Sequence, residues 1–220
     1  MCVIRGFSSI VQTIILPLSE STAFSRALEL LRAGEIVALP TDTVYGIMAD
    51  GYNADAIEKL FVAKDRPSHK AIQLLIADAS DLERVAAHVS TDARRLAETF
   101  FPGGLTLIVE ARADLPKNLR ADTNTIGVRL PDAPLVRELA RALGRPLAAT
   151  SANRSGGANP RTAQDALKDL DGRIALIVLF WIAPLSRRAY CARAQSRRMK
   201  SKRCWAFRSI IHKEGRHDRP

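Results

Sequence analysis

The sequence alternates between short, largely apolar runs and stretches with helical periodicity. Residues 36–39, 72–76 and 174–179 are apolar runs of strand length. Residues 19–33 instead repeat their apolar side chains at helical spacing, and Gly34 follows as a helix-ending residue. Strands that are apolar throughout are buried on both faces, and the intervening segments are long enough to form helices. This pattern predicts an open α/β sheet with helices covering its faces.

Local signals define the remaining elements. Asn53 is expected to cap a helix that ends near Asp65, because Pro67 disfavours a helical conformation at the residue before it. Residues 80–83 have the pattern of a capping box and predict another helix start. Three more strands are predicted, at residues 105–109, 125–129 and 146–149. Three more helices are predicted: one ending near Phe101, one at 135–143 before Gly144, and one capped by Thr162.

The charge of the chain is unevenly distributed. Of its 220 residues, 33 are Lys or Arg and 23 are Asp or Glu, yet residues 181–220 hold 12 of the basic residues and only two of the acidic ones. We therefore expect an N-terminal extension at 1–12, one main domain at 13–180 and a basic tail at 181–220 that is atypical or disordered. Such a tail could make nonspecific contacts with RNA phosphates.

Several protein classes are not indicated. Cys2, Cys191 and Cys204 are odd in number and lack CxxC spacing, so we expect neither a disulfide framework nor a zinc site, and we expect a reducing, cytoplasmic location. The longest apolar run, residues 174–185, falls well short of the roughly 20 residues that span a bilayer. No membrane partner is expected.

Basic side chains are the first candidates for binding phosphate, because neither a Walker loop nor a Rossmann fingerprint is present. Lys64, Arg66 and Lys70 cluster near a helix end and could neutralise a polyphosphate. The alternative is a solvated helix C-terminus, where cations are favoured by the helix dipole. His69 and His88 have no second ligand at a recognisable spacing, so no metal site built by the protein is expected.

Polar residues at strand ends are the second group of candidates. Arg129 lies on an apolar strand, so its guanidinium should be partly buried and need either a substrate carboxylate or an internal acid. Ser151 and Asn153 follow another strand and could bind ribose or phosphate, or could simply form a turn. Residues 41–43 and Tyr45 follow the first strand, where their polar side chains would face a crevice or would simply form a turn.

Five motifs, in this order, resemble the YrdC-like threonylcarbamoyl-AMP synthase family. They are LPTDTVYG at 39–46, KDRP at 64–67, FPGGLT at 101–106, GVRLP at 127–131 and SANRSG at 151–156. The resemblance covers about residues 13–178. It implies a single α/β domain with a twisted, open mixed sheet, helices on its faces and a deep substrate cavity.

The resemblance also implies an activity. A nucleotidyltransferase would make L-threonylcarbamoyladenylate and pyrophosphate from L-threonine, bicarbonate and ATP, with Mg²⁺ on the ATP. The product would pass to a tRNA threonylcarbamoyltransferase complex that forms N6-threonylcarbamoyladenosine at position 37 of tRNA. Carried over by motif position, threonine would be bound by Thr43, Arg129 and the backbone at Ala149. ATP would be bound by Lys64, Arg66, Lys70, Thr125, Ser151, Asn153 and Asn159. Catalysis would involve Lys64, Arg66, Ser151 and Asn153.

The family pattern stops at about Leu179, where alternation and charge balance are also lost. We hypothesise a frameshifted or otherwise altered C-terminus, which the other two reading frames of the coding DNA would test. Two alternative functions remain at this stage. One is a related domain that handles carbamoyl-adenylate, and the other is a noncatalytic module that binds tRNA or double-stranded RNA.

Overall fold

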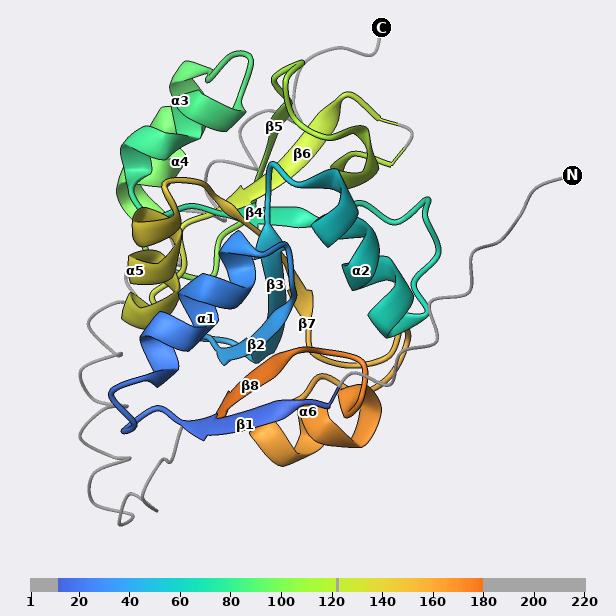
Figure 1. Cartoon of the computed structure of the whole chain (residues 1–220). Helices are drawn as coiled ribbons and strands as arrows, with labels where there is room; N and C mark the ends of the chain where they lie inside the picture. The colour runs from blue at the N-terminus through green and yellow to red at the C-terminus, as the bar shows by residue number, and fades with distance from the viewer. Residues whose placement is uncertain (1–11, 122, 180–220) are drawn as a thin grey trace, which may run out of the picture. The chain divides into compact units, whose positions relative to one another are not determined.

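The computed structural model describes residues 12–121 and 123–179, which form an eight-stranded sheet and six α-helices (Figure 1). The strands are β1 Ile14–Pro17, β2 Val37–Pro40, β3 Tyr45–Asp50, β4 Gln73–Leu75, β5 Leu107–Glu110, β6 Thr125–Arg129, β7 Leu147–Ser151 and β8 Leu176–Leu179. The helices are α1 Ala23–Arg32, α2 Ala54–Lys64, α3 Leu82–Val85, α4 Thr91–Phe100, α5 Pro134–Leu143 and α6 Ala163–Leu170. Two 3-10 turns, η1 Ala79–Asp81 and η2 Lys117–Leu119, complete the set.

The sheet is open and mixed, as predicted. Its strand order is β1-β8-β2-β3-β7-β4-β6-β5. β8 pairs in parallel with β1 and β2, and β4 pairs in parallel with β6. The remaining neighbours pair antiparallel. The central strands β3, β7 and β4 therefore come from three distant parts of the sequence.

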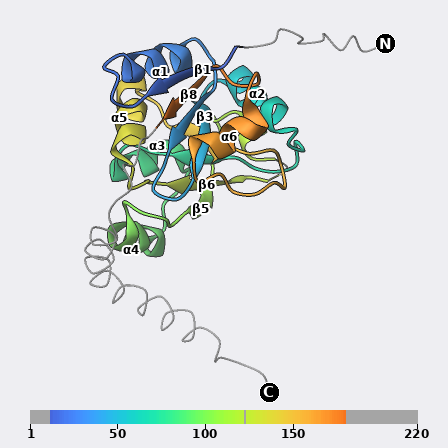
Figure 2. The same cartoon turned by 90° about the horizontal axis from the view of Figure 1, so that it is seen from below.

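Helices cover both faces of the sheet (Figure 2). α1 and α5 lie on one side of the strands, and α2 and α6 lie on the other. The two-residue period of a strand decides which side chain meets which layer. In β2, for example, Val37 and Leu39 join the α1/α5 core, whereas Ala38 joins the core of α2 and α6. This explains why the strands are apolar on both faces.

The helix boundaries follow the predicted caps. The Asn53 side chain accepts a hydrogen bond from the Ala56 backbone N–H at 3.0 Å, as an N-cap does. α2 ends at Asp65, which adopts the left-handed conformation with φ of 48°. Gly144 ends α5 with φ of 74°, a conformation that glycine adopts without a Cβ clash. Thr162 forms the capping box of α6.

Four predictions need correction. Residues 45–50 form the central strand β3, which was not predicted from the sequence, and it pairs with β2 and β7. Residues 14–17 form an edge strand that was not predicted from the sequence. Parallel pairing with β8 stabilises this strand. The capping box near residue 80 belongs to Asp78 and starts a 3-10 turn, so the helix after it, α3, has only four residues. β7 extends to Ser151, beyond the predicted end at residue 149, because it continues to pair with β3. The predictions for residues 1–11 and 180–220 lie outside the described residues.

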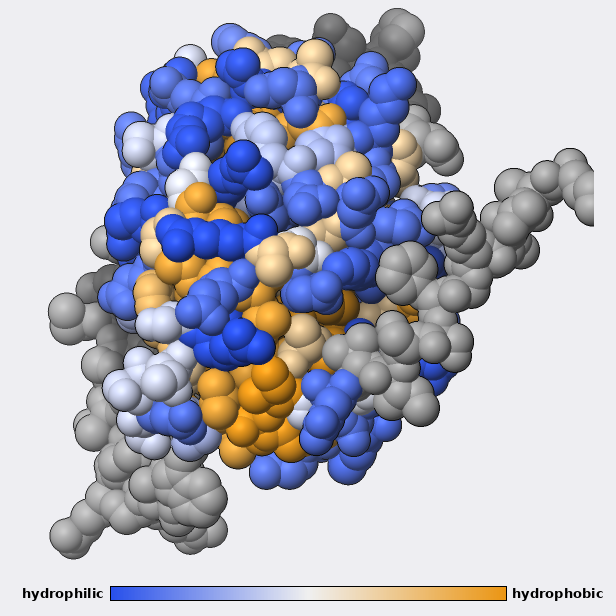
Figure 3. Space-filling view, viewed as in Figure 1, coloured by the Kyte–Doolittle hydropathy of each residue, from blue (hydrophilic) through white to orange (hydrophobic). Residues whose placement is uncertain are grey.

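The surface in Figure 3 is mainly hydrophilic, with apolar residues gathered over β1 and β8. Ile15 of the edge strand is 47% exposed and contributes apolar surface there. Within the described ranges, every helix is too short or too polar to meet the requirements of a membrane span.

Candidate functional site

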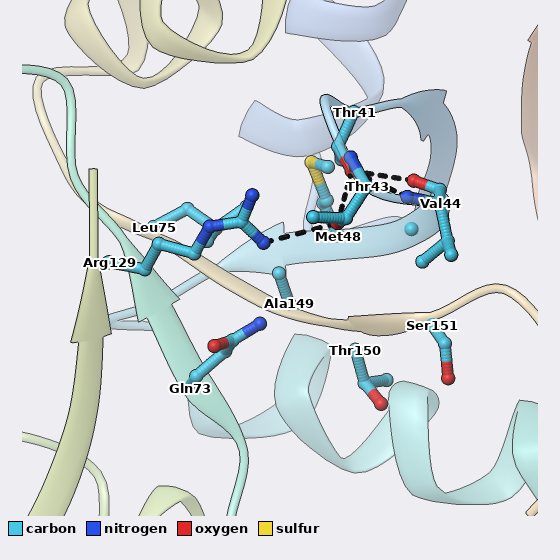
Figure 4. A pocket seen from close by; sticks show the side chains of 11 residues that line it. Thr41, Thr43, Val44, Met48, Gln73, Leu75, Arg129, Ala149, Thr150 and Ser151 are labelled. Atoms are coloured by element: carbon cyan, nitrogen blue, oxygen red, sulfur yellow. Dashed lines mark hydrogen bonds between the residues drawn. The ribbon is translucent and has the colours of Figure 1, made fainter. Parts of the chain in front are cut away.

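A pocket lies on the sheet face that carries α1 and α5, over β3, β7, β4 and β6 (Figure 4). Four of the predicted site residues line it: Thr43, Arg129, Ala149 and Ser151. They come from three segments that are widely separated in the sequence. The predicted threonine-binding set and one member of the predicted ATP-binding set are therefore neighbours in space.

The strand register explains why these side chains meet. Leu75 of β4 is paired with Arg129 of β6, and Gln73 of β4 is paired with Ala149 of β7. Side chains two residues apart share a face of the sheet, so Ser151 lies on the same face as Ala149. The pocket wall is thus a contiguous patch of one sheet face.

Two glycines on this sheet face allow close packing, and one of them, Gly46, lines the pocket. A Cβ at Gly46 would lie 3.3 Å from Cε of Met48 and 3.4 Å from the Thr150 carbonyl oxygen, inside the pocket lining. A Cβ at Gly127, on the same face as Arg129, would lie 3.0 Å from Cγ2 of Thr106. A larger side chain at Gly46 would fill space that a ligand could occupy.

The Arg129 guanidinium forms one end of the pocket and is buried. Its Nε donates a hydrogen bond to the Gly103 carbonyl at 2.8 Å, and its Nη1 donates one to the Thr43 hydroxyl at 3.2 Å. Its Nη2 forms an ion pair with Asp42. The predicted burial is confirmed, and an internal acid is present as the anionic partner. A substrate carboxylate would bind beside or in place of Asp42.

The residues after β2 both form a turn and face the pocket, which are the two possibilities that the sequence left open. The Thr41 hydroxyl donates to the Val44 carbonyl at 2.6 Å and accepts from the Val44 N–H at 3.2 Å, so it closes the turn. The closed turn presents the Thr43 hydroxyl to Arg129. Thr41 is thus a turn former, and Thr43 faces the pocket.

Lys64, Ser151 and Asn153 form a compact cluster at the other end of the pocket. The Lys64 side chain is buried, and its Nζ donates to the carbonyl oxygens of Ser151 and Asn153 and to Oδ1 of Asn153. The Ser151 hydroxyl also donates to Oδ1 of Asn153, at 2.5 Å. Lys64 therefore joins the end of α2 to the end of β7 and fixes where the Ser151 hydroxyl lies.

Burial and, to a smaller extent, the nearby Arg66 guanidinium together lower the pKa of Lys64 to about 8, against a weaker opposing effect of Asp169. A buried ammonium loses hydration, which disfavours its charged form. Since this pKa remains above 7, Lys64 is mainly protonated at neutral pH. The Ser151 end of the pocket is consequently electropositive.

Arg66 and Lys70 lie around this cluster. Arg66 is half-buried and donates to the Ala71 carbonyl at 2.7 Å. Lys70 is exposed, and its Nζ donates to the Ser155 hydroxyl at 3.4 Å. Lys70 thus contacts the segment that follows β7, and Arg66 holds the segment around Lys70 and Ala71. Their roles in binding ATP stay predictions.

Two other predicted ATP contacts lie outside the pocket lining. Thr125 is exposed at the start of β6, and its hydroxyl is 3.2 Å from the Thr123 hydroxyl. Asn159 is exposed on the loop before α6. Their roles, like the depth of the cavity, stay predictions.

Sequence reasoning missed several pocket residues, including Met48, Gln73, Leu75 and Thr150. Only Gln73 could have stood out in the sequence, as a polar residue inside an apolar run. In the part of the chain that the structure describes, no three His, Cys, Asp or Glu side chains gather as a metal site would require.

Comparisons with known proteins identify the family. A family model described as "Telomere recombination", for Sua5, YciO and YrdC proteins, matches residues 29–184. A threonylcarbamoyl-AMP synthase of Bacillus subtilis is 44% identical over 155 residues, which are 70% of this chain and 45% of the relative. A Vibrio cholerae protein of the same name is 34% identical over 155 residues, 70% of this chain and 82% of the relative.

Solved structures agree in fold. The Pyrococcus abyssi Sua5 structure complexed with L-threonine has a TM-score of 0.71 and 32% identity, covering 78% of this chain and 50% of that one. Escherichia coli YciO has a TM-score of 0.67 and 25% identity, and the match covers 77% of this chain and 83% of that one.

The chain spans less than half the length of the first two curated relatives that it matches, those of B. subtilis and P. abyssi. The family match nevertheless extends over most of the chain and includes every residue of the pocket. The chain therefore belongs to the Sua5/YciO/YrdC family.

Proposed function

We propose that this chain is a threonylcarbamoyl-AMP synthase, a nucleotidyltransferase that uses L-threonine, bicarbonate and ATP. The observation that carries the proposal is the joint presence of Arg129 and Ser151 in one pocket. A guanidinium suits a carboxylate, and the electropositive end at Ser151 suits a phosphate. The curated relatives named as threonylcarbamoyl-AMP synthases support the same activity.

The proposed reaction has two steps. The amine of threonine combines with bicarbonate to form a carbamate and water. A carbamate oxygen then attacks the α-phosphorus of ATP, the bond to the β-phosphate oxygen breaks, and pyrophosphate leaves. Neither step needs a covalent intermediate with the protein.

The chain would act by positioning the reactants and stabilising charge. Arg129 and the Thr43 hydroxyl would hold the amino acid, with the backbone at Ala149 beside it. Ser151 would bind the nucleotide, with Asn153 oriented by Lys64. Arg66 and Lys70 would stabilise the charge on the leaving pyrophosphate.

Mg²⁺ is proposed to enter with ATP, where it would neutralise phosphate charge. Asp42, the acid nearest to the Arg129 end, is already paired with that guanidinium. Phosphate oxygens, which hard cations prefer, would therefore provide most of the ligands. The proposed compartment is the cytoplasm, and the product would pass to a tRNA threonylcarbamoyltransferase complex.

A pyrophosphate-release assay tests the proposal. Release should require ATP, L-threonine and bicarbonate together, and should fall to background when any one is omitted. Release that is independent of threonine would favour the carbamoyl-adenylate alternative. RNA binding without any ATP turnover would favour the noncatalytic alternative, and a chain truncated after residue 180 would show whether the basic tail carries that binding.

A further inference from the structure

The middle of the pocket contains a polar side chain that the proposed function has not used. Gln73 of β4 lines the pocket and is half-buried. Its Oε1 accepts a hydrogen bond from the Thr106 hydroxyl at 3.1 Å. This bond fixes the amide so that Nε2, the donor end, faces the pocket.

The amide nitrogen is available to a ligand. Figure 4 shows it turned toward Ala149, while the amide oxygen points away. No hydrogen bond joins this nitrogen to another group within residues 12–121 and 123–179. A half-buried donor with a fixed orientation and no protein partner is suited to bind a ligand oxygen.

The strand register places Gln73 midway between the two ends of the pocket. Arg129 is level with Leu75, and Gln73 lies two residues back along β4, level with Ala149. Ser151 lies two residues further in the same direction along β7. At about 3.3 Å per residue, each offset is roughly 7 Å.

The proposed reaction puts one group at this midpoint. The carbamate carbon is bonded to the amine of the amino acid on one side, and a carbamate oxygen attacks the α-phosphorus on the other. An amino acid held at Arg129 and a nucleotide held near Ser151 therefore place the carbamate between them. Its second oxygen needs a hydrogen-bond donor there.

We propose that Gln73 is the residue that binds the bicarbonate-derived group, with Nε2 donating a hydrogen bond to the carbamate oxygen that does not attack phosphorus. This inference rests on the proposed function and adds a residue to it. Thr106 is a positioning residue, because it acts by orienting the Gln73 amide. A neutral donor suits this place, since it binds an oxygen without drawing the phosphates away from the cations at the Ser151 end.

The test compares Gln73→Leu with the wild-type chain in CO2-depleted buffer to which bicarbonate is added back. Because the acceptor is an anion, loss of this hydrogen bond should raise the KM for bicarbonate roughly 10- to 100-fold. The KM for ATP and the Kd for L-threonine should each change less than about twofold. Thr106→Val should shift the bicarbonate KM in the same direction by a smaller factor, with Gln73 still present.

Gln164→Leu is the matched control, because Gln164 is an exposed glutamine of α6 outside the pocket lining. It should leave all three constants unchanged. Equal rises in the three constants for Gln73→Leu, or a rise for threonine alone, would overturn the inference and leave the proposed function intact. A wild-type chain that releases no pyrophosphate under any condition would overturn both.

Discussion

Replacement of Arg129 by alanine tests the amino-acid end of the pocket. The guanidinium is bonded through all three nitrogens, to Gly103, Thr43 and Asp42. Its loss leaves the Asp42 carboxylate, which is only 13% exposed, without a cation. Breaking a buried ion pair costs about 3–5 kcal/mol of unfolding free energy, and the partial exposure of Asp42 favours the lower value. Because domains are stable by about 5–15 kcal/mol, we expect the variant to fold.

The effect on binding should be selective. Hydrogen bonds to a charged group contribute about 1.5–3 kcal/mol, so Arg129→Ala should weaken L-threonine binding roughly 10- to 100-fold. ATP is proposed to bind at the Ser151 end, so its affinity should change less than about threefold. Calorimetric titration of each ligand measures both numbers on the same protein.

Arg137→Ala is the matched control. Arg137 also donates to a backbone carbonyl, that of Ala77 at 2.9 Å, and pairs with an acid, Asp78, at 3.4 Å, but it lies outside the pocket lining. It should lower stability without a selective loss of threonine. Urea denaturation should also show that adding Asp42→Asn to Arg129→Ala recovers about 1 kcal/mol, because the unpaired carboxylate is removed.

An equal loss of threonine and ATP affinity in Arg129→Ala would refute the assignment of Arg129 to the substrate carboxylate. A stability unchanged from wild type would refute the argument from burial. These outcomes are independent, so the structural role and the binding role can fail separately.

Three further predictions concern other parts of the molecule. The pKa of Lys64 is about 8 in the folded chain against an ordinary value of 10.5, so the unfolded state binds more protons between these pH values. Urea denaturation should therefore show that the unfolding free energy of wild type, relative to that of Lys64→Met, rises from about pH 8 to 10.5. A difference that does not change with pH would contradict the burial argument. Gly46→Ala places a methyl group 3.3 Å from Met48, which should raise the KM for L-threonine about tenfold, and an unchanged KM would mean that the ligand does not use this space. Asn53→Ala removes the N-cap of α2 and should lower the unfolding free energy by about 1 kcal/mol, whereas an unchanged denaturation midpoint would show that the cap is dispensable.

Local chemistry in the sequence was sufficient for most elements. The pattern correctly predicted the caps at Asn53 and Thr162 and the helix ends at Asp65 and Gly144, because these depend on residues within a few positions. The apolar runs identified most of the buried strands for the same reason, but the buried central strand β3 was not predicted. β1 was missed because it is only four residues long and becomes a strand through pairing with β8 at the edge of the sheet.

The candidate site was predictable to a smaller extent. The five motifs gave Thr43, Arg129 and Ser151 as candidates by resemblance to a family, and the structure brings all three to one pocket. The sequence alone did not show whether Arg129 pairs with an internal acid or with a ligand. The ion pair with Asp42 depends on how the turn after β2 folds beside β6.

The sequence by itself determined the α/β class, most helix ends and the residue types that suit an anionic substrate, because these depend on short-range pattern and side-chain chemistry. Only the tertiary structure decided that Gln73 faces the pocket and that Lys64 is buried against the end of β7. Both facts depend on strand order and register, which join residues that lie between 54 and 89 positions apart in the sequence. Such long-range pairing is set by the packing of the whole sheet, and no local pattern encodes it.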